Sequence, residues 1–116
     1  MTMTRTIPLE AHDALVLATA PVMMIGPYVL TFSPAVGLVS FFLGALLMSV
    51  ALAGSTRSLP VSAHASFDVA LGATIFSIGI LAGIFGEPAI AAIFLVGFGA
   101  AHLALTAATR YSARSA

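Results

Sequence analysis

The sequence predicts an all-α integral membrane protein whose four transmembrane helices form two tandem helical hairpins. Three observations predict this fold class. The chain of 116 residues is 60% hydrophobic and only 7% charged, whereas soluble domains carry about 25% charged residues. Its uncharged stretches have lengths that suit one or two membrane crossings. Several short patterns also recur 52 to 55 residues apart. We therefore expect residues 1–116 to form a single transmembrane domain in a lipid bilayer.

The charged residues set the number of spans. No acidic or basic side chain lies between Asp13 and Arg57, and uncharged stretches also separate Asp68 from Glu87 and Glu87 from Arg110. A helix needs about 20 apolar residues to cross a hydrocarbon core of about 30 Å. The first stretch therefore holds two spans, and each of the others holds one.

Turn residues place the boundaries between the spans. Ser33 is a candidate N-cap, and Pro34 suits the first helical position because its missing N–H is not needed there. The residues Gly-Glu-Pro at 86–88 divide the second pair of spans in the same way. The predicted helices lie at about 13–31, 35–54, 66–85 and 88–108.

The first span has an alternative interpretation as a cleaved signal peptide. Arg5 and the small residues at 18–20 weakly resemble such a signal. However, Glu10 and Asp13 precede the span, and only a few apolar residues come before Ala18. We therefore expect the span to be retained.

The basic residues predict the orientation. One basic residue precedes the first span, one lies in the central linker and two follow the last span. The two hairpin turns contain no basic residue. The four basic residues are Arg5, Arg57, Arg110 and Arg114. Because cytoplasmic loops are enriched in positive charge, we predict a multi-pass protein of the cell (inner) membrane with both termini cytoplasmic.

An internal repeat organises the chain. The sequence Ile-Pro-Leu-Glu-Ala-His at 7–12 recurs as Leu-Pro-Val-Ser-Ala-His at 59–64, and Gly44 recurs as Gly97. Two spans per copy give both copies the same orientation, so the symmetry axis is expected to run along the membrane normal. Chance recurrence in an apolar sequence is the alternative. The proposed copies span about 7–57 and about 59–110.

The first copy resembles a known family. Residues 26–32, Gly-Pro-Tyr-Val-Leu-Thr-Phe, are similar to the Ser-Pro-Trp-Val-Leu-Gly-Phe core of the SPW-repeat membrane proteins, with Gly26 in place of the serine and Tyr28 in place of the tryptophan. That family has an acidic residue fourteen positions before the proline, and Asp13 stands at this distance from Pro27. The motif can be recognised only in the first copy. The resemblance implies a four-helix, two-repeat architecture and no established activity.

Small residues predict where helices pack. Gly79 and Gly83 form a GxxxG pair in the third span, and Gly97 and Ala101 have the same spacing in the fourth. Lipid supplies no hydrophobic force between helices, so close backbone packing at small residues holds a bundle together. Such contacts form either within the chain or with another subunit.

Ionisable groups within a membrane are the first places to look for function. His102 is the one ionisable residue clearly inside a predicted span. It is a candidate ligand for haem or pigment, a hydrogen-bond partner for a quinone, or a proton relay. The alternative is a structural histidine bonded to a neighbouring helix, for example to Ser49, its repeat equivalent.

A second group of ionisable residues lies at the cytoplasmic side. The twofold repeat relates His12 to His64, near Asp13 and Asp68. If the axis brings them together, two histidines and two aspartates would suit Zn²⁺ or Mn²⁺. The spacings match no established metal motif, so the sequence assigns no metal site, and a polar collar at the interface is the alternative.

These observations narrow the possible functions. The chain has no Lys, four Arg and no Cys, so nothing indicates nucleic-acid binding or thiolate chemistry. Phosphate-binding loops, nucleophile elbows and HExxH are absent from the sequence, so we expect no enzyme activity. The predicted function is an accessory or structural subunit that packs against other membrane subunits or forms a homo-oligomer. The alternative is a module that binds a lipid or cofactor (haem, pigment or quinone) through His102 or the His12/His64 pair.

Overall fold

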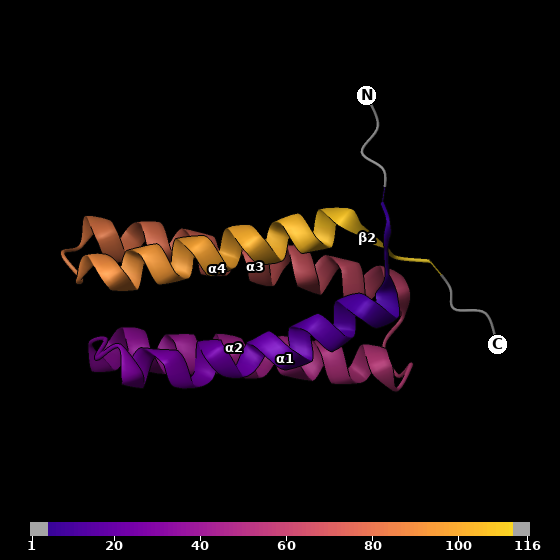
Figure 1. The fold of residues 1–116 in the computed structure, drawn as a ribbon, viewed down its shortest axis with the longest axis horizontal. Helices are drawn as coiled ribbons and strands as arrows, with labels where there is room; N and C mark the ends of the chain where they lie inside the picture. The colour runs from indigo at the N-terminus through magenta and orange to yellow at the C-terminus, as the bar shows by residue number, and fades with distance from the viewer. Residues whose placement is uncertain (1–4, 113–116) are drawn as a thin grey trace, which may run out of the picture.

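The computed structural model describes residues 5–112, and this part of the chain is helical apart from two short strands, the turns and linker between the helices, and its two ends (Figure 1). All four helices are long and apolar enough to cross a membrane, which confirms the predicted fold class. The elements in order are β1 (Ile7–Pro8), α1 (Leu9–Val29), α2 (Pro34–Ser55), α3 (Val61–Ile84), α4 (Ala89–Ala108) and β2 (Thr109–Arg110).

Helices α1 and α3 begin four to five residues earlier than predicted. They start at Leu9 and Val61, directly after Pro8 and Pro60. Proline fixes φ near the helical value and needs no hydrogen-bond acceptor, so it favours a helix start. The charged residues mark where the apolar segment begins, but the helix itself extends beyond that point. As a result His12 and His64 lie on helices rather than in flanking loops.

The four helices form two hairpins that lie side by side, α1 against α2 and α3 against α4 (Figure 1). Glycine makes the close approach possible in each hairpin. A Cβ added to Gly44 of α2 would lie 3.0 Å from the backbone oxygen of Ala20, and one added to Gly99 of α4 would lie 2.6 Å from the backbone nitrogen of Phe76. Gly44 and Gly99 therefore each lie at the close contact between the two helices of their own hairpin.

Gly97, the predicted counterpart of Gly44 in the second copy, does not lie at such a contact. A Cβ added to Gly97 would meet nothing within 4 Å, and Ala101 is exposed. Two positions along a helix turn the side chain by about 200°, so Gly97 lies opposite the packed face of Gly99. Gly97 thus faces away from the rest of the chain, whereas the exposed Ala101 lines a cavity between α1 and α4.

The two glycines of the predicted GxxxG pair in α3 pack against α4 to different degrees. A Cβ on Gly79 would lie 2.6 Å from the backbone nitrogen of Val96, so this glycine packs tightly against α4 as expected. A Cβ on Gly83 would make an ordinary contact of 3.5 Å with Ala92. The close approach of α3 and α4 therefore depends on Gly79 more than on Gly83.

The two hairpins are tied together at both ends of the bundle. At one end β1 pairs in parallel with β2, with Ile7 opposite Thr109, so the second repeat ends beside the start of the first (Figure 1). At the other end the Ser33 hydroxyl donates a hydrogen bond to the Glu87 carboxylate, which joins the two hairpin turns.

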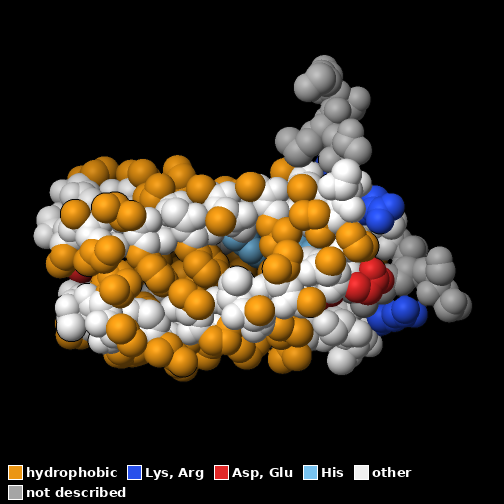
Figure 2. All heavy atoms as spheres, in the orientation of Figure 1, with side chains coloured by type: hydrophobic (Ala, Val, Ile, Leu, Met, Phe, Trp, Pro, Cys, Tyr) orange, Lys and Arg blue, Asp and Glu red, His pale blue; other side chains and the backbone are white. Residues whose placement is uncertain are grey.

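Apolar side chains fill the centre of the bundle and also cover much of its outside (Figure 2). Basic side chains gather at the end that carries the termini and the linker (Figure 2). This distribution suits a bundle surrounded by lipid with one charged end in water. The buried core cluster consists of Val16, Ala20, Met23, Leu43, Leu47, Ala51, Leu71, Ile75 and Leu95.

Candidate metal centre

Five ionisable side chains meet inside the bundle near the end that carries the termini. They come from three helices: His12 and Asp13 from α1, His64 and Asp68 from α3, and His102 from α4. Each is at most 5% exposed. Burial of charged groups is costly unless they are paired or bind a metal. We call these five residues the His–Asp cluster.

Helical spacing and two glycines position the cluster. His64 and Asp68 are one turn apart on the same face of α3. A Cβ on Gly54 would lie 2.3 Å from Cε1 of His64, and one on Gly72 would lie 3.1 Å from Cδ2 of His102. Because these glycines have no side chain, the two imidazole rings can occupy the space beside them.

Asp68 lies at the centre of the cluster. Its Oδ2 is 3.0 Å from Nε2 of His12 and 3.2 Å from Nε2 of His64, and its Oδ1 is 3.4 Å from Nε2 of His102. The same Oδ2 accepts a 2.6 Å hydrogen bond from the hydroxyl of Tyr111. One carboxylate thus connects both hairpins with the segment that follows α4.

His64 has carboxylate oxygens on two sides. Its Nε2 lies 3.1 Å from Oδ1 of Asp13 and 3.2 Å from Oδ2 of Asp68, yet it makes no well-formed hydrogen bond within residues 5–112. Two ligand atoms, each about 2.0–2.1 Å from a tetrahedral Zn²⁺, lie about 3.3 Å apart. The observed separations match those between ligands of one metal ion, and they equally match charge-assisted hydrogen bonds between imidazole and carboxylate.

The proton positions on His12 can be worked out from its neighbours. Its Nδ1 is 2.8 Å from Oγ1 of Thr109, whose hydroxyl donates to the carbonyl of Leu105 at 2.6 Å. A hydroxyl has one proton, so Nδ1 of His12 must be the donor to Thr109. In the neutral ring, Nε2 then presents its lone pair to Oδ2 of Asp68. Two lone pairs 3.0 Å apart repel each other, so either a second ring proton or a cation is needed between these atoms.

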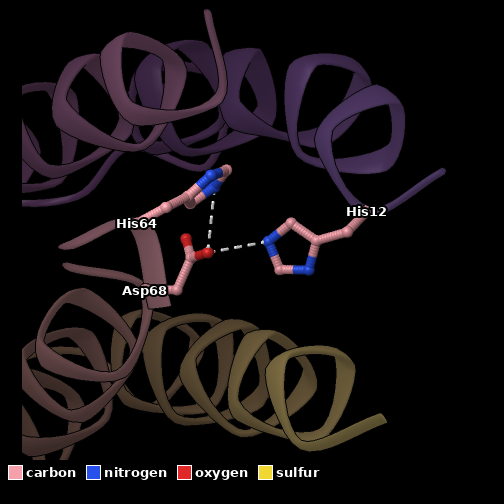
Figure 3. A group of neighbouring side chains, drawn as sticks. All are labelled: His12, His64 and Asp68. Carbon is pink, nitrogen blue, oxygen red and sulfur yellow. Dashed lines mark ion pairs between the residues drawn. The ribbon is translucent and has the colours of Figure 1, made fainter. Parts of the chain in front are cut away.

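Three of the ligand atoms form a compact group (Figure 3). One ligand atom each from His12, His64 and Asp68 all lie within 4.8 Å of one another. Two histidines and one carboxylate are typical of sites for Zn²⁺ and for non-haem Fe(II). We call these residues the metal triad. Its ligands come from α1 in one hairpin and α3 in the other.

Tyr111 lies against the cluster beyond the end of α4. Its ring centroid is 5.5 Å from that of His12 and 5.7 Å from that of His64. Burial and the hydrogen bond to Asp68 raise the pKa of the Tyr111 phenol above its ordinary value. The phenol therefore stays protonated at neutral pH and acts as a hydrogen-bond donor to the carboxylate.

A cavity of about 190 Å³ reaches the cluster from the linker between the hairpins. Its lining residues are Leu9, Gly54, Arg57, Leu59, Pro60, Val61 and His64. Arg57 is exposed and has a positive φ of 59° at the end of α2. The cavity therefore offers a path between the charged end of the bundle and the imidazole of His64.

The structure brings together several residues that the sequence analysis singled out. His12 and His64 meet beside Asp13 and Asp68, as the twofold hypothesis required. His102 contacts Asp68 rather than Ser49, whose hydroxyl bonds to the carbonyl of Ala45 in its own helix. The sequence analysis places neither Thr109 nor Tyr111 in a site, because a polar residue at the end of a span does not by itself indicate a ligand contact.

The residues of the family-like motif divide between the two ends of α1. Asp13 belongs to the His–Asp cluster, whereas Gly26, Pro27 and Tyr28 lie about 20 Å away along the helix. Pro27 is buried, a Cβ on Gly26 would lie 3.2 Å from Phe94, and Tyr28 is 62% exposed. Gly26 and Pro27 therefore contribute to packing at the opposite end of the bundle.

The chain matches no protein-family model, no curated protein and no solved structure. The resemblance to the SPW-repeat proteins therefore stays a prediction.

Proposed function

We propose that this protein is a metal-binding membrane protein that holds one divalent transition-metal ion between its two hairpins. His12, His64 and Asp68 are the proposed ligands. The observation that carries the proposal is the Thr109 contact, which makes Nδ1 of His12 a donor, so that in the neutral ring the Nε2 lone pair faces the Asp68 carboxylate. A cation at this place turns that repulsion into coordination. Hydrogen bonding of the second ring nitrogen is also typical of metal-ligating histidines.

The charge of the cluster supports a divalent ion. Asp13 and Asp68 are buried carboxylates, and no Lys or Arg belongs to the cluster that residues 5–112 form. With neutral histidines, the two carboxylates carry two negative charges that one divalent cation neutralises. Nitrogen and oxygen ligands together suit Zn²⁺, Fe²⁺ or Mn²⁺ rather than Ca²⁺ or Mg²⁺, which prefer oxygen alone.

Metal binding would join the hairpins. The ligands belong to α1 and α3, and these helices lie in different repeats. Because binding energy at a site formed only in the folded state is also folding energy, the ion would stabilise the association of the repeats. We place the cluster at the cytoplasmic side of the inner membrane, because Arg5, Arg57 and Arg110 lie at that end.

The test is metal analysis of the purified protein. The protein is extracted in mild detergent, stripped with a chelator, and reloaded separately with Zn²⁺, Mn²⁺ or Fe²⁺ under reducing conditions. We expect one ion per chain by elemental mass spectrometry. We expect loss of that ion in His64→Ala and Asp68→Asn. Glu87→Gln changes a carboxylate at the opposite end of the bundle and is the matched control. A wild-type protein that retains no more metal than His64→Ala would refute the proposal.

The accessory-subunit function stays a second proposal, and a separate observation favours it. Gly97 faces away from the rest of the chain and leaves the backbone of α4 open to a close approach. Another membrane subunit or a second copy of this chain would fit there. The test is the mass of the assembly extracted from native membranes, with Gly97→Leu as the blocking variant. If the wild type and Gly97→Leu are both extracted as single chains of the same mass, the accessory-subunit proposal is contradicted.

A further inference from the structure

A cavity opens between α3, α4 and the segment that leads into β1, at the end of the bundle that carries the termini. Its volume is about 300 Å³. A second, more open cavity of about 440 Å³ lies on the surface of α3 and shares Ala65 and Val69 with the first. The two cavities therefore form one continuous hollow, which we call the α3 groove.

The end of the α3 groove near the termini is polar. Arg5, Thr106 and Tyr111 line it. Arg5 is exposed and forms no ion pair within residues 5–112. The Thr106 hydroxyl lies near the Tyr111 phenol but makes no well-formed hydrogen bond in the same part of the chain. No acidic residue is among the described lining residues, so the positive charge of Arg5 has no counter-ion in the groove.

The groove becomes apolar toward the middle of the bundle. Val69 and Leu103 line its deeper part, and Ala70 continues it along α3. Val69 lies eight residues after the first residue of α3, which corresponds to about 12 Å along the helix. The hydroxyl of Ser66 is bonded to the carbonyl of Ser62 in its own helix. The groove therefore runs from a cation at the end of the bundle to an apolar surface within the span.

This order of cation and apolar surface matches the structure of a phospholipid. A lipid beside the bundle has its phosphate near the helix ends and its acyl chains along the spans. Arg5 precedes β1, which lies across the end of the bundle (Figure 1), so it is at the level of the phosphate. A guanidinium binds phosphate oxygens in pairs, and basic sites between transmembrane helices are typical places for anionic head groups.

We propose that the α3 groove binds one phospholipid with an anionic head group. Arg5 contacts the phosphate, and one acyl chain lies along α3 over Ala65 and Val69, while the other chain stays in the bilayer. A zwitterionic head group fits less well, because its ammonium group finds no acidic partner among the described lining residues. The site goes beyond the proposed metal binding, since no residue of the metal triad lines the groove.

The experiment compares phosphatidylglycerol with phosphatidylcholine of the same acyl chains, each added to the full-length protein in detergent and counted by native mass spectrometry. One phosphatidylglycerol per chain is expected, with about fivefold weaker binding of phosphatidylcholine, because a single basic residue near the membrane surface favours an anionic lipid by about this factor. Arg5→Gln should remove the preference. Arg110→Gln is the matched control, since Arg110 is an exposed basic residue at the same end that does not line the groove; it should keep the preference.

A second pair of variants tests the contact with the chain. Ala107→Leu narrows the groove and should weaken binding of both lipids about fivefold or more. Ala104→Leu changes an exposed residue of α4 outside the groove and should bind as the wild type does. Inorganic phosphate should not displace the lipid. The proposal is overturned by equal binding of the two lipids to the wild type, by equal effects within either pair of variants, or by displacement with inorganic phosphate.

The metal content of the same samples separates this proposal from the previous one. Arg5→Gln should lose the lipid preference and keep its metal ion, whereas His64→Ala should lose metal and keep the lipid preference. A wild-type protein that holds metal but does not prefer phosphatidylglycerol would refute only the lipid site. One that prefers phosphatidylglycerol but holds no metal would refute only the metal site.

Discussion

Gly54 of α2 and His64 of α3 are so close that a Cβ on the glycine would lie 2.3 Å from Cε1 of the imidazole. The same Cβ would lie 2.8 Å from Oδ2 of Asp13. These residues come from three different helices. A side chain as small as a methyl group at position 54 therefore cannot coexist with the observed positions of both ionisable groups.

The first prediction concerns this contact. Gly54→Ala should displace His64, lower the metal content and destabilise the protein by about 1–3 kcal/mol, as overpacking of a well-packed site usually does. Gly97→Ala is the matched control, because its added Cβ would meet nothing within 4 Å. It should bind metal normally and be equally stable or more stable by up to about 1 kcal/mol, since alanine favours helix more than glycine does. Elemental analysis and thermal unfolding measure both effects. Normal metal content in Gly54→Ala would show that the ligands do not occupy the positions described.

The second prediction concerns the packing of α3 against α4. Gly99→Ala should destabilise the bundle by about 1–3 kcal/mol, because its Cβ would lie 2.6 Å from the backbone nitrogen of Phe76 and a helix backbone cannot shift locally. Gly83→Ala should have little effect, since its Cβ would make an ordinary contact with Ala92. Thermal unfolding in detergent measures the difference. Equal stability of the two variants would contradict the described helix contact.

The fold could be predicted from the sequence because its strongest signals are local. Uncharged segments of the right length between charged residues identify the four spans, and Ser33 and Pro34 mark a turn that the structure confirms. The helix starts were misplaced because Pro8 and Pro60 begin α1 and α3 before the apolar segment does. The charged residues mark the ends of the apolar segments, whereas the prolines mark where α1 and α3 begin.

The site could be predicted only in part. The repeat suggested that His12 and His64 lie together, because both stand at the same place in their copies. The number of residues between corresponding positions of the two copies was harder to predict. It changes along the repeat, because α3 is three residues longer than α1. Gly99, not Gly97, makes the close helix contact in the second hairpin that Gly44 makes in the first. The contacts of Tyr111 depend on β2 pairing with β1, which no sequence pattern indicates.

The third prediction concerns the hydrogen bond that orients His12. Thr109→Val removes the acceptor for Nδ1 of His12 and should weaken metal binding about 10- to 100-fold, as loss of an outer partner commonly does. Thr74→Val is the matched control. The Thr74 hydroxyl bonds to the carbonyl four residues earlier, as that of Thr109 does, but Thr74 is exposed and has no hydrogen bond to a histidine within residues 5–112. Competition with a chelating dye measures the affinities. Equal affinities in the two variants would remove the evidence for a fixed tautomer of His12.

The fourth prediction concerns Tyr111 as a donor to Asp68. Tyr111→Phe should destabilise the metal-free protein by about 1–3 kcal/mol, because a buried carboxylate loses a charge-assisted hydrogen bond. The same substitution should destabilise the metal-loaded protein less, since a bound cation already stabilises the Asp68 carboxylate. Tyr28→Phe, which changes an exposed phenol at the other end of α1, is the control and should leave stability unchanged.

Unfolding is measured with and without chelator for the wild type and both tyrosine variants. Because the pKa of Tyr111 is raised in the folded protein, the phenol's contribution to stability is complete below its unfolded pKa of about 10 and is lost as the pH rises above it. The difference between Tyr111→Phe and the wild type should therefore be constant around neutral pH and shrink in strong alkali. Equal destabilisation of the metal-free and metal-loaded proteins would mean that the phenol and the ion do not act on the same Asp68 carboxylate.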